Sequence, residues 1–416
     1  MPDALKTGLG GIDDSVKLVI NGTVILIAEA WDVHEGVLSQ PSTWSLSLGS
    51  GDIAASIIDK FGVGPKFKFQ LYVGNALQQS GYVDGIMAEQ PAGGATRVTL
   101  KGRDALAPLQ DTYVKASIGA NVSTYAELVW FALQQVGIVP MSQHYDPNDT
   151  TVLRSDNSAN RNIKSGTQIN AILPHRTVEQ ILADVGSSNG GVTVGVTTTP
   201  PQAKLHETWH HFIRRHIDRA GLMLWAAADG GFVLSAPDGN QSPTYLLRRT
   251  TGKPLDSARG NVVAMRWEDD RTHRHSEAIV YGRGGGKAVG RVKSKGGFVD
   301  DEMVASGYTQ PIVFRDANTK VPVEAAFFAR RKLAEERRSG WKLEYTVSGS
   351  TLPNFSNGGL SRAVLVPDTV IQVEDDELGF HGPFYLESLD RRRGPMSTTL
   401  LRLVRIEDLI FGSDED

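Results

Sequence analysis

The alternation of hydrophobic and polar residues near the end of the chain predicts three consecutive antiparallel strands. Side chains on a strand point to opposite faces in turn, so a half-buried strand carries an apolar residue at every second position. An acidic turn closed by glycine and a Gly-Pro turn separate three segments of this kind. The segments are Thr369–Val373, Pro383–Leu389 and Thr398–Val404. The pattern therefore predicts a β-meander within residues 366–405.

The same plan of strands occurs near the start of the chain. The predicted strands there are Phe67–Val73, Gly81–Ala88 and Arg97–Lys101. The spacing nearly matches, because 11 residues separate Gln70 from Gly81 and 10 separate Gln372 from Gly382. An internal repeat of this kind indicates an architecture that uses one structural unit twice.

Further strand signals precede the first copy of the repeat. KLVING at 17–22 predicts a strand that enters an Asn-Gly turn, which is a strong hairpin signal. TVILIAEAWDVHE at 23–35 and STWSLSLGS at 42–50 continue the strand pattern, and DIAASIIDK at 52–60 predicts one short helix over the sheet. About five to six strands are enough to form a small barrel or a tight sandwich.

Apolar residues at helical spacing predict helices in the middle of the chain. The predicted helices are Ser123–Val136, Thr177–Gly186, Leu205–Ala220 and Val323–Arg338. Ser123 or Thr124 can act as an N-cap, and Gly137 can end the first helix. Strand patterns lie between the helices, with a hairpin formed by Leu222–Trp225 and Gly231–Ser235 and single strands at Asn261–Trp267, Glu277–Tyr281 and Trp341–Val347.

These elements predict an α+β fold that is mostly β, with two similar antiparallel β-barrel domains and an intervening α/β region. The predicted division is a flexible arm at 1–15, a first barrel at 16–116, a helical and loop-rich insert at 117–220, a hairpin at 221–240 that contributes to the second barrel, an α/β connecting region at 241–340, a second barrel at 341–406 and an acidic tail at 407–416. Within the insert, the Asn- and Asp-rich residues 141–166 predict a long surface loop.

Composition narrows the possible classes of protein. A chain of 416 residues with 40% hydrophobic and 22% charged residues is typical of a globular protein with several domains. The absence of cysteine excludes disulfides, thiol nucleophiles and thiolate metal sites, and the net charge of −4 argues against a general nucleic-acid coat. We find no long apolar run and no secretory leader, and we expect synthesis in the cytoplasm without membrane insertion.

One segment carries a pattern known from zinc peptidases. His206-Glu207-Thr208-Trp209-His210 is an HExxH sequence on a predicted helix, where His206 and His210 would bind zinc and Glu207 would activate water. His216 falls at the third ligand position of the extended motif, but that form needs glycine where Ile213 stands. A continuous helix would also turn His216 away from the first two histidines. We therefore favour an amphipathic core helix and keep the zinc hydrolase as the alternative.

Three other charged or glycine-rich segments have simpler interpretations. GRGGGK at 282–287 lacks the residues that a phosphate-binding loop needs at both ends, so the loop at 282–297 is interpreted as a basic surface loop. The four acids of Glu374–Glu377 lack the spaced ligands of a calcium loop and predict a solvated turn. Arg391–Arg393 is interpreted in the same way, as a charged turn. No catalytic residue, metal or cofactor is assigned.

The order of elements resembles the baseplate hub proteins of contractile-tailed phages and related injection systems, the late control protein D-like family. The segments that carry the resemblance are INGTVI at 20–25, STWSLSLGS, VTLKGRDALAPLQDTYV at 98–114, Thr208–Pro237, Glu324–Val347 and the closing meander. Together these segments cover roughly Val16 to Ile406. The polar loop and the HExxH sequence have no counterpart in the resemblance.

The resemblance implies a non-enzymatic structural protein of the virion tail baseplate or of an injection-system particle. Such hubs are homotrimers in which each chain contributes two tube-like barrels, so that six similar units adapt a sixfold tail tube to a threefold spike. The implied partners are the tail tube protein, the central spike protein and baseplate wedge proteins, with DNA only in transit through the lumen. A third possibility, a carbohydrate-binding tail module, rests only on Trp31, Trp44, Trp225 and Trp267, which lie in strand patterns typical of core residues.

Overall fold

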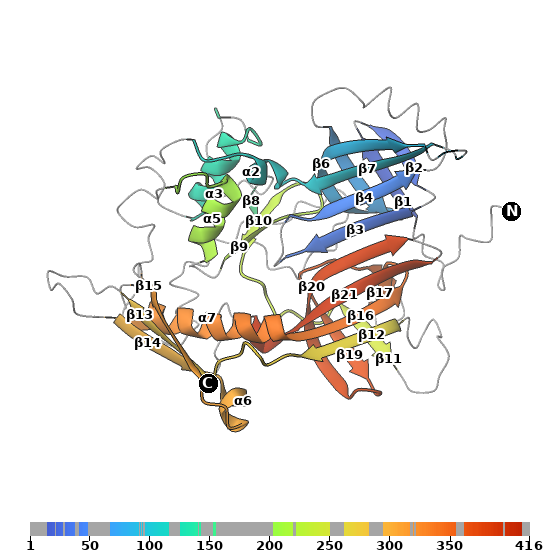
Figure 1. The fold of residues 1–416 in the computed structure, drawn as a ribbon. Coiled ribbons are helices and arrows are strands. Elements are labelled where there is room, and N and C mark those ends of the chain that lie inside the picture. The colour runs from blue at the N-terminus through green and yellow to red at the C-terminus, as the bar shows by residue number, and fades with distance from the viewer. Residues whose placement is uncertain are drawn as a thin grey trace.

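The computed structural model, drawn as a ribbon in Figure 1, describes most of the chain. The described residues are 15–20, 22–27, 30–37, 41–48, 67–90, 92, 94, 96–115, 125–139, 141–142, 153–154, 203–218, 222–249, 262–282, 294–316, 319, 322–354, 362–393 and 396–409. Outside them lie almost all of the predicted N-terminal arm, the short helices predicted at 52–60 and Thr177–Gly186, most of the polar loop at 141–166, the basic residues 283–293 and the tail beyond 409.

One sheet of 13 strands, antiparallel except for one pair of strands, organises the described part of the chain. Its first half contains β1 Val16–Ile20, β2 Thr23–Ile27, β3 Ala30–Gly36, β4 Thr43–Leu48, β5 Lys68–Val73, β6 Ala76–Glu89 and β7 Arg97–Asp104. These strands follow the order β3-β4-β7-β6-β5-β1-β2. We call them the first unit. Its inward-facing apolar side chains, such as Leu18, Leu46 and Leu100, form one buried cluster.

The second half of the sheet repeats this order. It contains β11 Tyr245–Arg249, β12 Val262–Asp269, β16 Trp341–Ser348, β19 Thr369–Asp375, β20 Phe380–Arg393 and β21 Ser397–Arg405, which we call the second unit. The strands follow the order β12-β16-β21-β20-β19-β11, so each pairing in β3-β4-β7-β6-β5 has a counterpart. The outermost pair differs, since β1 pairs antiparallel to β5 whereas β11 pairs parallel to β19.

The internal repeat predicted from the sequence is thus present, and the two three-stranded meanders are β5-β6-β7 and β19-β20-β21. Both meanders bulge at the same place, between Val83 and Gly85 in β6 and between Leu386 and Ser388 in β20. The predicted mostly β, α+β class is confirmed. Among the described strands the sheet is an open path, so closure of each unit into a barrel stays a prediction.

Two predicted boundaries are wrong. The hairpin β9 Met223–Ala226 and β10 Phe232–Ser235 forms, but it pairs with β8 Leu153–Arg154 in a separate small sheet rather than with the second unit. Conversely, β11 and β12 belong to the second unit, although the sequence placed them in the connecting region. Apolar alternation identifies a strand, but the choice of its neighbour depends on contacts far along the chain.

A helical insert packs beside the first unit and contains the hairpin (Figure 1). Its helices are α2 Ala107–Asp111, α3 Tyr125–Gln135 and α5 Trp209–Ile217. Their apolar faces and one face of the hairpin share a buried cluster that includes Leu128, Trp209, Phe212 and Phe232. The predicted first helix is confirmed as α3. The helix predicted at Leu205–Ala220 is shorter, because it begins only at Trp209.

A second insert separates β12 from β16, at the position where only residues 37–42 separate β3 from β4 in the first unit. It contains β13 Glu277–Gly282, β14 Ser294–Val299, α6 Asp301–Ala305, β15 Pro311–Asp316 and the long helix α7 Pro322–Gly340. The end of the loop predicted at 282–297 is therefore strand β14. Helix α7 covers this three-stranded sheet and leads directly into β16 (Figure 1).

The close contact between α7 and β14 requires glycine at one position. A Cβ atom at Gly296 would lie 2.2 Å from the backbone nitrogen of Ala326 in α7, whereas one at the adjacent Gly297 would have no atom closer than 3.4 Å. We expect Gly296→Ala to cost roughly 2–3 kcal/mol in the free energy of unfolding, because helix and strand must separate. Gly297→Ala, the matched control, should cost less than about 1 kcal/mol in the same urea titration. Equal effects would contradict this packing.

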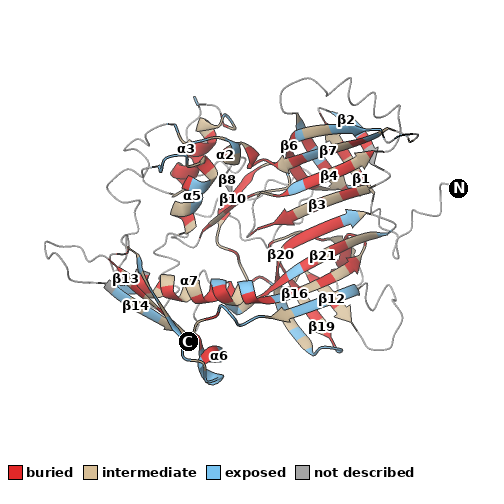
Figure 2. Ribbon diagram, in the orientation of Figure 1, coloured by how far each residue is buried: buried red, intermediate tan, exposed pale blue. Residues whose placement is uncertain are grey.

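Buried residues occur on the strands of both units along the length of the sheet (Figure 2). The second unit has its own core cluster, with Leu247, Leu343, Tyr345, Ile371 and Leu401 all fully buried. Within the described residues, no helix is both long enough and apolar enough to cross a membrane.

Candidate functional site

The two units meet at a strand junction that joins both halves of the chain into one sheet. The second half of β20 pairs antiparallel with β3, from Ser388 opposite Gly36 to Arg393 opposite Trp31. In Figure 1 this junction lies where the blue strands of the first unit meet the red strands of the second. Residues more than 350 positions apart therefore become neighbours, and the junction determines how one unit is placed against the other.

A buried ion pair lies on the inner face of the junction. The Arg391 guanidinium is fully buried and donates to Glu35 Oε2 at 2.6 Å and to Gln78 Oε1 at 2.9 Å. It also donates to the backbone oxygen of Leu365. Burial raises the pKa of the Glu35 carboxyl, while the charge and the hydrogen bond of Arg391 oppose this shift. Because β3, β6 and the segment before β19 each supply one partner, Arg391 of β20 connects both units at a single point.

Two further ion pairs lie on the outer face of the junction. His34 Nδ1 and Asp390 Oδ1 are 2.5 Å apart, and Arg392 Nε lies 3.2 Å from Asp32 Oδ2. Burial acts to raise the pKa of Asp390, but the hydrogen bond and charge of His34 outweigh it and lower the pKa below its usual value. All three charge pairs link β20 to β3. The two strands are therefore held together by side-chain charge pairs as well as by backbone hydrogen bonds.

The sequence interpretation of Arg391–Arg393 as a solvated turn is wrong. These residues end strand β20, and Arg391 is among the largest fully buried side chains. Asp390 precedes them and Gly394-Pro395 follows, so the local sequence resembles a surface turn. The available signal was the repeat itself, because β6 continues as a strand for nearly the same distance beyond its bulge, to Glu89.

The interpretation of the acidic segment at Glu374–Glu377 needs a similar correction. Asp375 is fully buried, accepts a hydrogen bond from the Tyr345 hydroxyl at 2.8 Å and lies 3.3 Å from Arg249. Glu374 pairs with Arg248 at 2.6 Å, and Glu377 pairs with Arg249. These carboxylates therefore hold strand β11 against β19. Among the described residues they do not form a group that could hold a metal ion.

The HExxH segment does not form the geometry of a zinc peptidase. Helix α5 begins at Trp209, and its N-cap Thr208 accepts a hydrogen bond from the backbone nitrogen of His211 at 3.3 Å. His206 precedes the helix with a φ of 58° and does not share a helical face with His210. Among the described residues, no group of three or more histidines and carboxylates could hold a metal ion.

The other two groups of the motif have local structural roles. Glu207 accepts two hydrogen bonds from Arg215, each at 2.9 Å, and one from the Lys204 backbone nitrogen at 2.7 Å. Burial acts to raise the pKa of Glu207, but these hydrogen bonds outweigh it, and the net shift is downward. Burial, together with the positive charge of Arg214, lowers the pKa of His210 to about 4.

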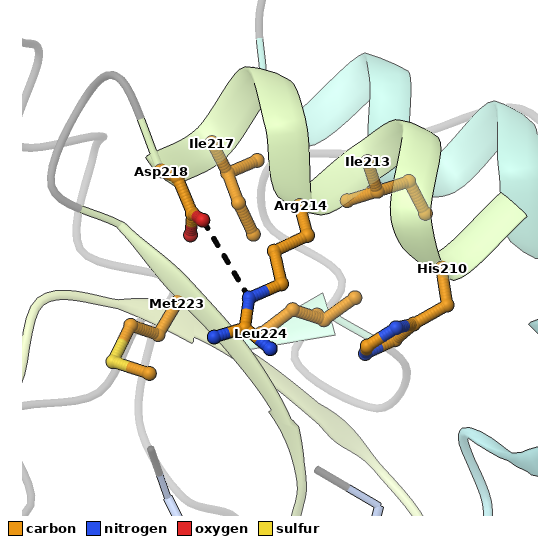
Figure 3. Close-up of a pocket in the computed structure, with 7 residues that line it drawn as sticks. All are labelled: His210, Ile213, Arg214, Ile217, Asp218, Met223 and Leu224. Carbon is orange, nitrogen blue, oxygen red and sulfur yellow. Dashed lines mark ion pairs between the residues drawn. The ribbon is translucent and has the colours of Figure 1, made fainter. Parts of the chain in front are cut away.

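His210 borders a small cavity between α5 and the β9-β10 hairpin, which Figure 3 shows in close-up. The cavity holds about 20 Å³, which is enough for one water molecule but not for a substrate. Arg214 and Asp218 form an ion pair at 3.5 Å along one side (Figure 3). The segment therefore has the surroundings of a packed amphipathic helix.

Comparison with known proteins identifies the fold. No family model matches the sequence, and no curated protein sequence matches it either. Among solved structures, the 43 kDa tail protein of prophage MuSo2 from Shewanella oneidensis has a TM-score of 0.65 at 15% identity, covering 95% of this chain and 99% of that one. The tail protein from Neisseria meningitidis MC58 has a TM-score of 0.65 at 18% identity, covering 95% and 98%.

A component of a secretion system has a weaker similarity. The c3393 protein of E. coli, described as a component of the type VI secretion system with structural similarity to T4 bacteriophage tail proteins gp27 and gp5, has a TM-score of 0.51 at 12% identity, covering 96% of this chain and 79% of that one. The chain therefore has the fold of phage tail proteins. The resemblance noted from the sequence is confirmed for the fold as a whole.

Proposed function

We propose that this chain is a structural protein of a phage tail or a related contractile injection apparatus, and that it acts as the baseplate hub. The observation that supports this proposal most directly is the junction of β20 with β3, which joins two units of equal strand order into one sheet. A wall made of repeated units is the construction that a ring around a lumen needs. The fold similarity to phage tail proteins over nearly the whole chain supports the same proposal.

In this proposal three copies of the chain form a closed ring. Each copy supplies two equivalent units, so the ring presents six similar units to a sixfold tail tube and retains threefold symmetry toward a central spike. The tail tube protein, the spike protein and baseplate wedge proteins are the proposed partners. DNA would pass through the lumen without specific recognition, and no catalytic role is assigned to any residue.

The zinc hydrolase, which is the alternative from another class, has no observation in its favour. Glu207 is held by Arg215, and His206 lies outside the helix that contains His210. The carbohydrate-binding alternative also has little support from its four tryptophans, because Trp31, Trp44 and Trp225 are buried and only Trp267 is exposed, at 49%.

The mass of the purified protein tests the hub proposal. Because one chain has a mass of 45.1 kDa, we expect a species of about 135 kDa by light scattering. Averaged electron micrographs should then show a ring with six similar units and threefold symmetry. A stable monomer at micromolar concentration, or a ring that contains six copies of the chain, would overturn the proposal.

A further inference from the structure

The internal repeat identifies two strand edges that, unlike their counterparts, have no partner among the described strands. In the second unit, the half of β20 beyond its bulge pairs with β21 on one side and with β3 on the other. In the first unit, the equivalent half of β6 pairs only with β7 among the described strands. Strand β12, which corresponds to β3, likewise pairs only with β16 within the part of the chain that the structure describes. Each chain therefore has both halves of a second junction, but at opposite ends of the sheet.

Two exposed apolar side chains on these edges occupy positions that are buried at the first junction. Val33 of β3 is fully buried against β20, whereas Trp267, at the equivalent position of β12, is 49% exposed. The sequence placed Trp267 in the core, and the structure shows that only part of it packs, against Phe380. On β6, Met87 is 50% exposed, although its equivalent Asp390 is buried against β3. Exposed apolar groups on an unpaired strand are typical of an interaction site.

We propose that the second half of β6, Asp84–Glu89, pairs antiparallel with β12 of a second copy of this chain, which reproduces between chains the β20–β3 junction within the chain. This proposal deepens the hub function and rests on it. The contact joins two different surfaces, so repeated addition of copies generates a ring when the rotation closes. The backbone hydrogen bonds of strand addition supply affinity, and side chains select the register.

The repeat also specifies the register. Gly85 and Ser388 each follow the bulge and face Lys101 and Arg402 on the next strand. Asp32 and Arg266 likewise face equivalent residues of β4 and β16. Transfer of the β20–β3 register then places four residues of β6 opposite four residues of β12. The resulting pairs are Ile86 with Asp269, Met87 with Glu268, Ala88 with Trp267 and Glu89 with Arg266.

The charges at the transferred register are complementary. Glu89 and Arg266 occupy the positions that Arg392 and Asp32 occupy in the first junction, where the two side chains form an ion pair at 3.2 Å. In the first junction the arginine lies on β20 and the acid on β3, whereas here the acid lies on β6 and the arginine on β12. An acid and an arginine therefore face each other in both cases. Trp267 would lie over the small side chain of Ala88 and beside Ile86, so the partner strand would cover its exposed face. Arg266, which contacts Glu268 at 2.6 Å within the chain, has exposed surface available for the new contact.

Cysteine cross-linking tests the register directly, because the chain contains no cysteine of its own. Directly opposite residues of an antiparallel pair have Cα atoms about 4.5–5.5 Å apart, within the range of a disulfide. A mixture of Glu89→Cys and Arg266→Cys chains should form a disulfide-linked dimer under mild oxidation, and the double variant should form a three-chain species. The control mixture of Glu89→Cys with Arg315→Cys, which lies on exposed strand β15, should remain uncross-linked.

Charge reversal provides an independent test of the same contact. Glu89→Arg or Arg266→Glu alone should lower the association constant roughly 10-fold, because like charges then face each other across the interface. The combined variant should recover association to within about 3-fold of the parent. Arg315→Glu, a reversal at another exposed arginine, should change association by less than about 2-fold. Analytical ultracentrifugation measures all four.

The outcomes separate this inference from the hub proposal. A trimer that shows neither the cross-link nor rescue by the combined variant would overturn the β6–β12 interface and leave the hub proposal standing. A protein that remains monomeric at all concentrations would overturn both. Cross-linking of either edge to a different protein of the particle, in place of a second copy, would also overturn the inference.

Discussion

Replacement of Arg391 by alanine is expected to destabilise the protein by about 3–5 kcal/mol, because it leaves the Glu35 carboxylate buried without its cation. Glu35 is only 5% exposed, and its Oε1 atom has no hydrogen-bond partner among the described residues. The variant also removes the donors that Gln78 and the backbone oxygen of Leu365 use. The midpoint of urea unfolding should fall accordingly, with the second unit separating from the first.

A neighbouring arginine provides the matched control. Arg392 is 65% exposed at its side chain and pairs with Asp32 on the outer face of the same strand. Because solvent screens this pair, Arg392→Ala should cost less than about 1 kcal/mol. The double variant Glu35→Gln with Arg391→Met should recover most of the stability lost in Arg391→Ala, because no buried charge then remains. Equal costs for Arg391→Ala and Arg392→Ala would show that the ion pair does not hold the junction.

Replacement of Trp209 by alanine is expected to cost a similar amount, about 3–5 kcal/mol, through the cavity that the lost indole leaves. Trp209 is 1% exposed and makes edge contacts with Phe131 and Phe212, with ring centroids 5.9 and 5.8 Å apart. The contact with Phe131 joins α5 to α3 in the core of the helical insert, whereas Phe212 lies in α5 itself. The loss should therefore be concentrated in the insert, while the large sheet remains folded.

Hydrogen exchange followed by mass spectrometry can locate the effect of Trp209→Ala. We expect faster exchange at the amides of α3 and α5 and unchanged exchange in β16 and β21, because these strands belong to a separate core. His211→Ala is the control, since the exposed His211 follows Trp209 by two residues in the same helix. A uniform increase in exchange over the whole chain would contradict an independently stable insert.

The duplication explains why two inserts of different construction coexist with a regular sheet. The helical insert follows β7 and returns to the second unit at β11, so it lies between the two copies of the repeat. The α/β insert lies within the second copy, between the strands that correspond to β3 and β4. An insertion in the connection between two strands leaves their pairing unchanged. Its main thermodynamic cost is the entropy lost when the longer connection is closed, and this cost grows only slowly with length.

The sequence predicted those features that depend on neighbouring residues. Alternation in Thr398–Val404 identified β21, and the Gly and Pro turns separated the strands of both meanders. The helical spacing of α3 and the length of α7 were equally visible. The start of α5 was predicted too early, because the apolar stripe includes Leu205. With Thr208 as its N-cap, the helix begins at Trp209, four residues later, and Leu205 is 89% exposed.

The charged residues were the ones that local pattern misjudged. Arg391 and Asp375 lie in runs of charge that are normally solvated, yet both are fully buried. Their partners Glu35 and Tyr345 lie 356 and 30 residues away, so no local spacing could reveal the compensation. The HExxH motif is a different case, because the residue types of the zinc alternative are present but the backbone does not bring His206 and His210 to one helical face.

By itself, then, the amino-acid sequence determined the strands, the main helices and the existence of two copies of one unit, because periodicity and turn chemistry act over a few residues. Only the tertiary structure decided which strands are neighbours, which unit the β9-β10 hairpin accompanies and which charges lie inside. Strand pairing links backbone groups hundreds of residues apart, and a buried charge is tolerated only where such pairing brings its counterion. Pairing between distant strands formed the β20–β3 junction and left the edges of β6 and β12 unpaired among the described strands.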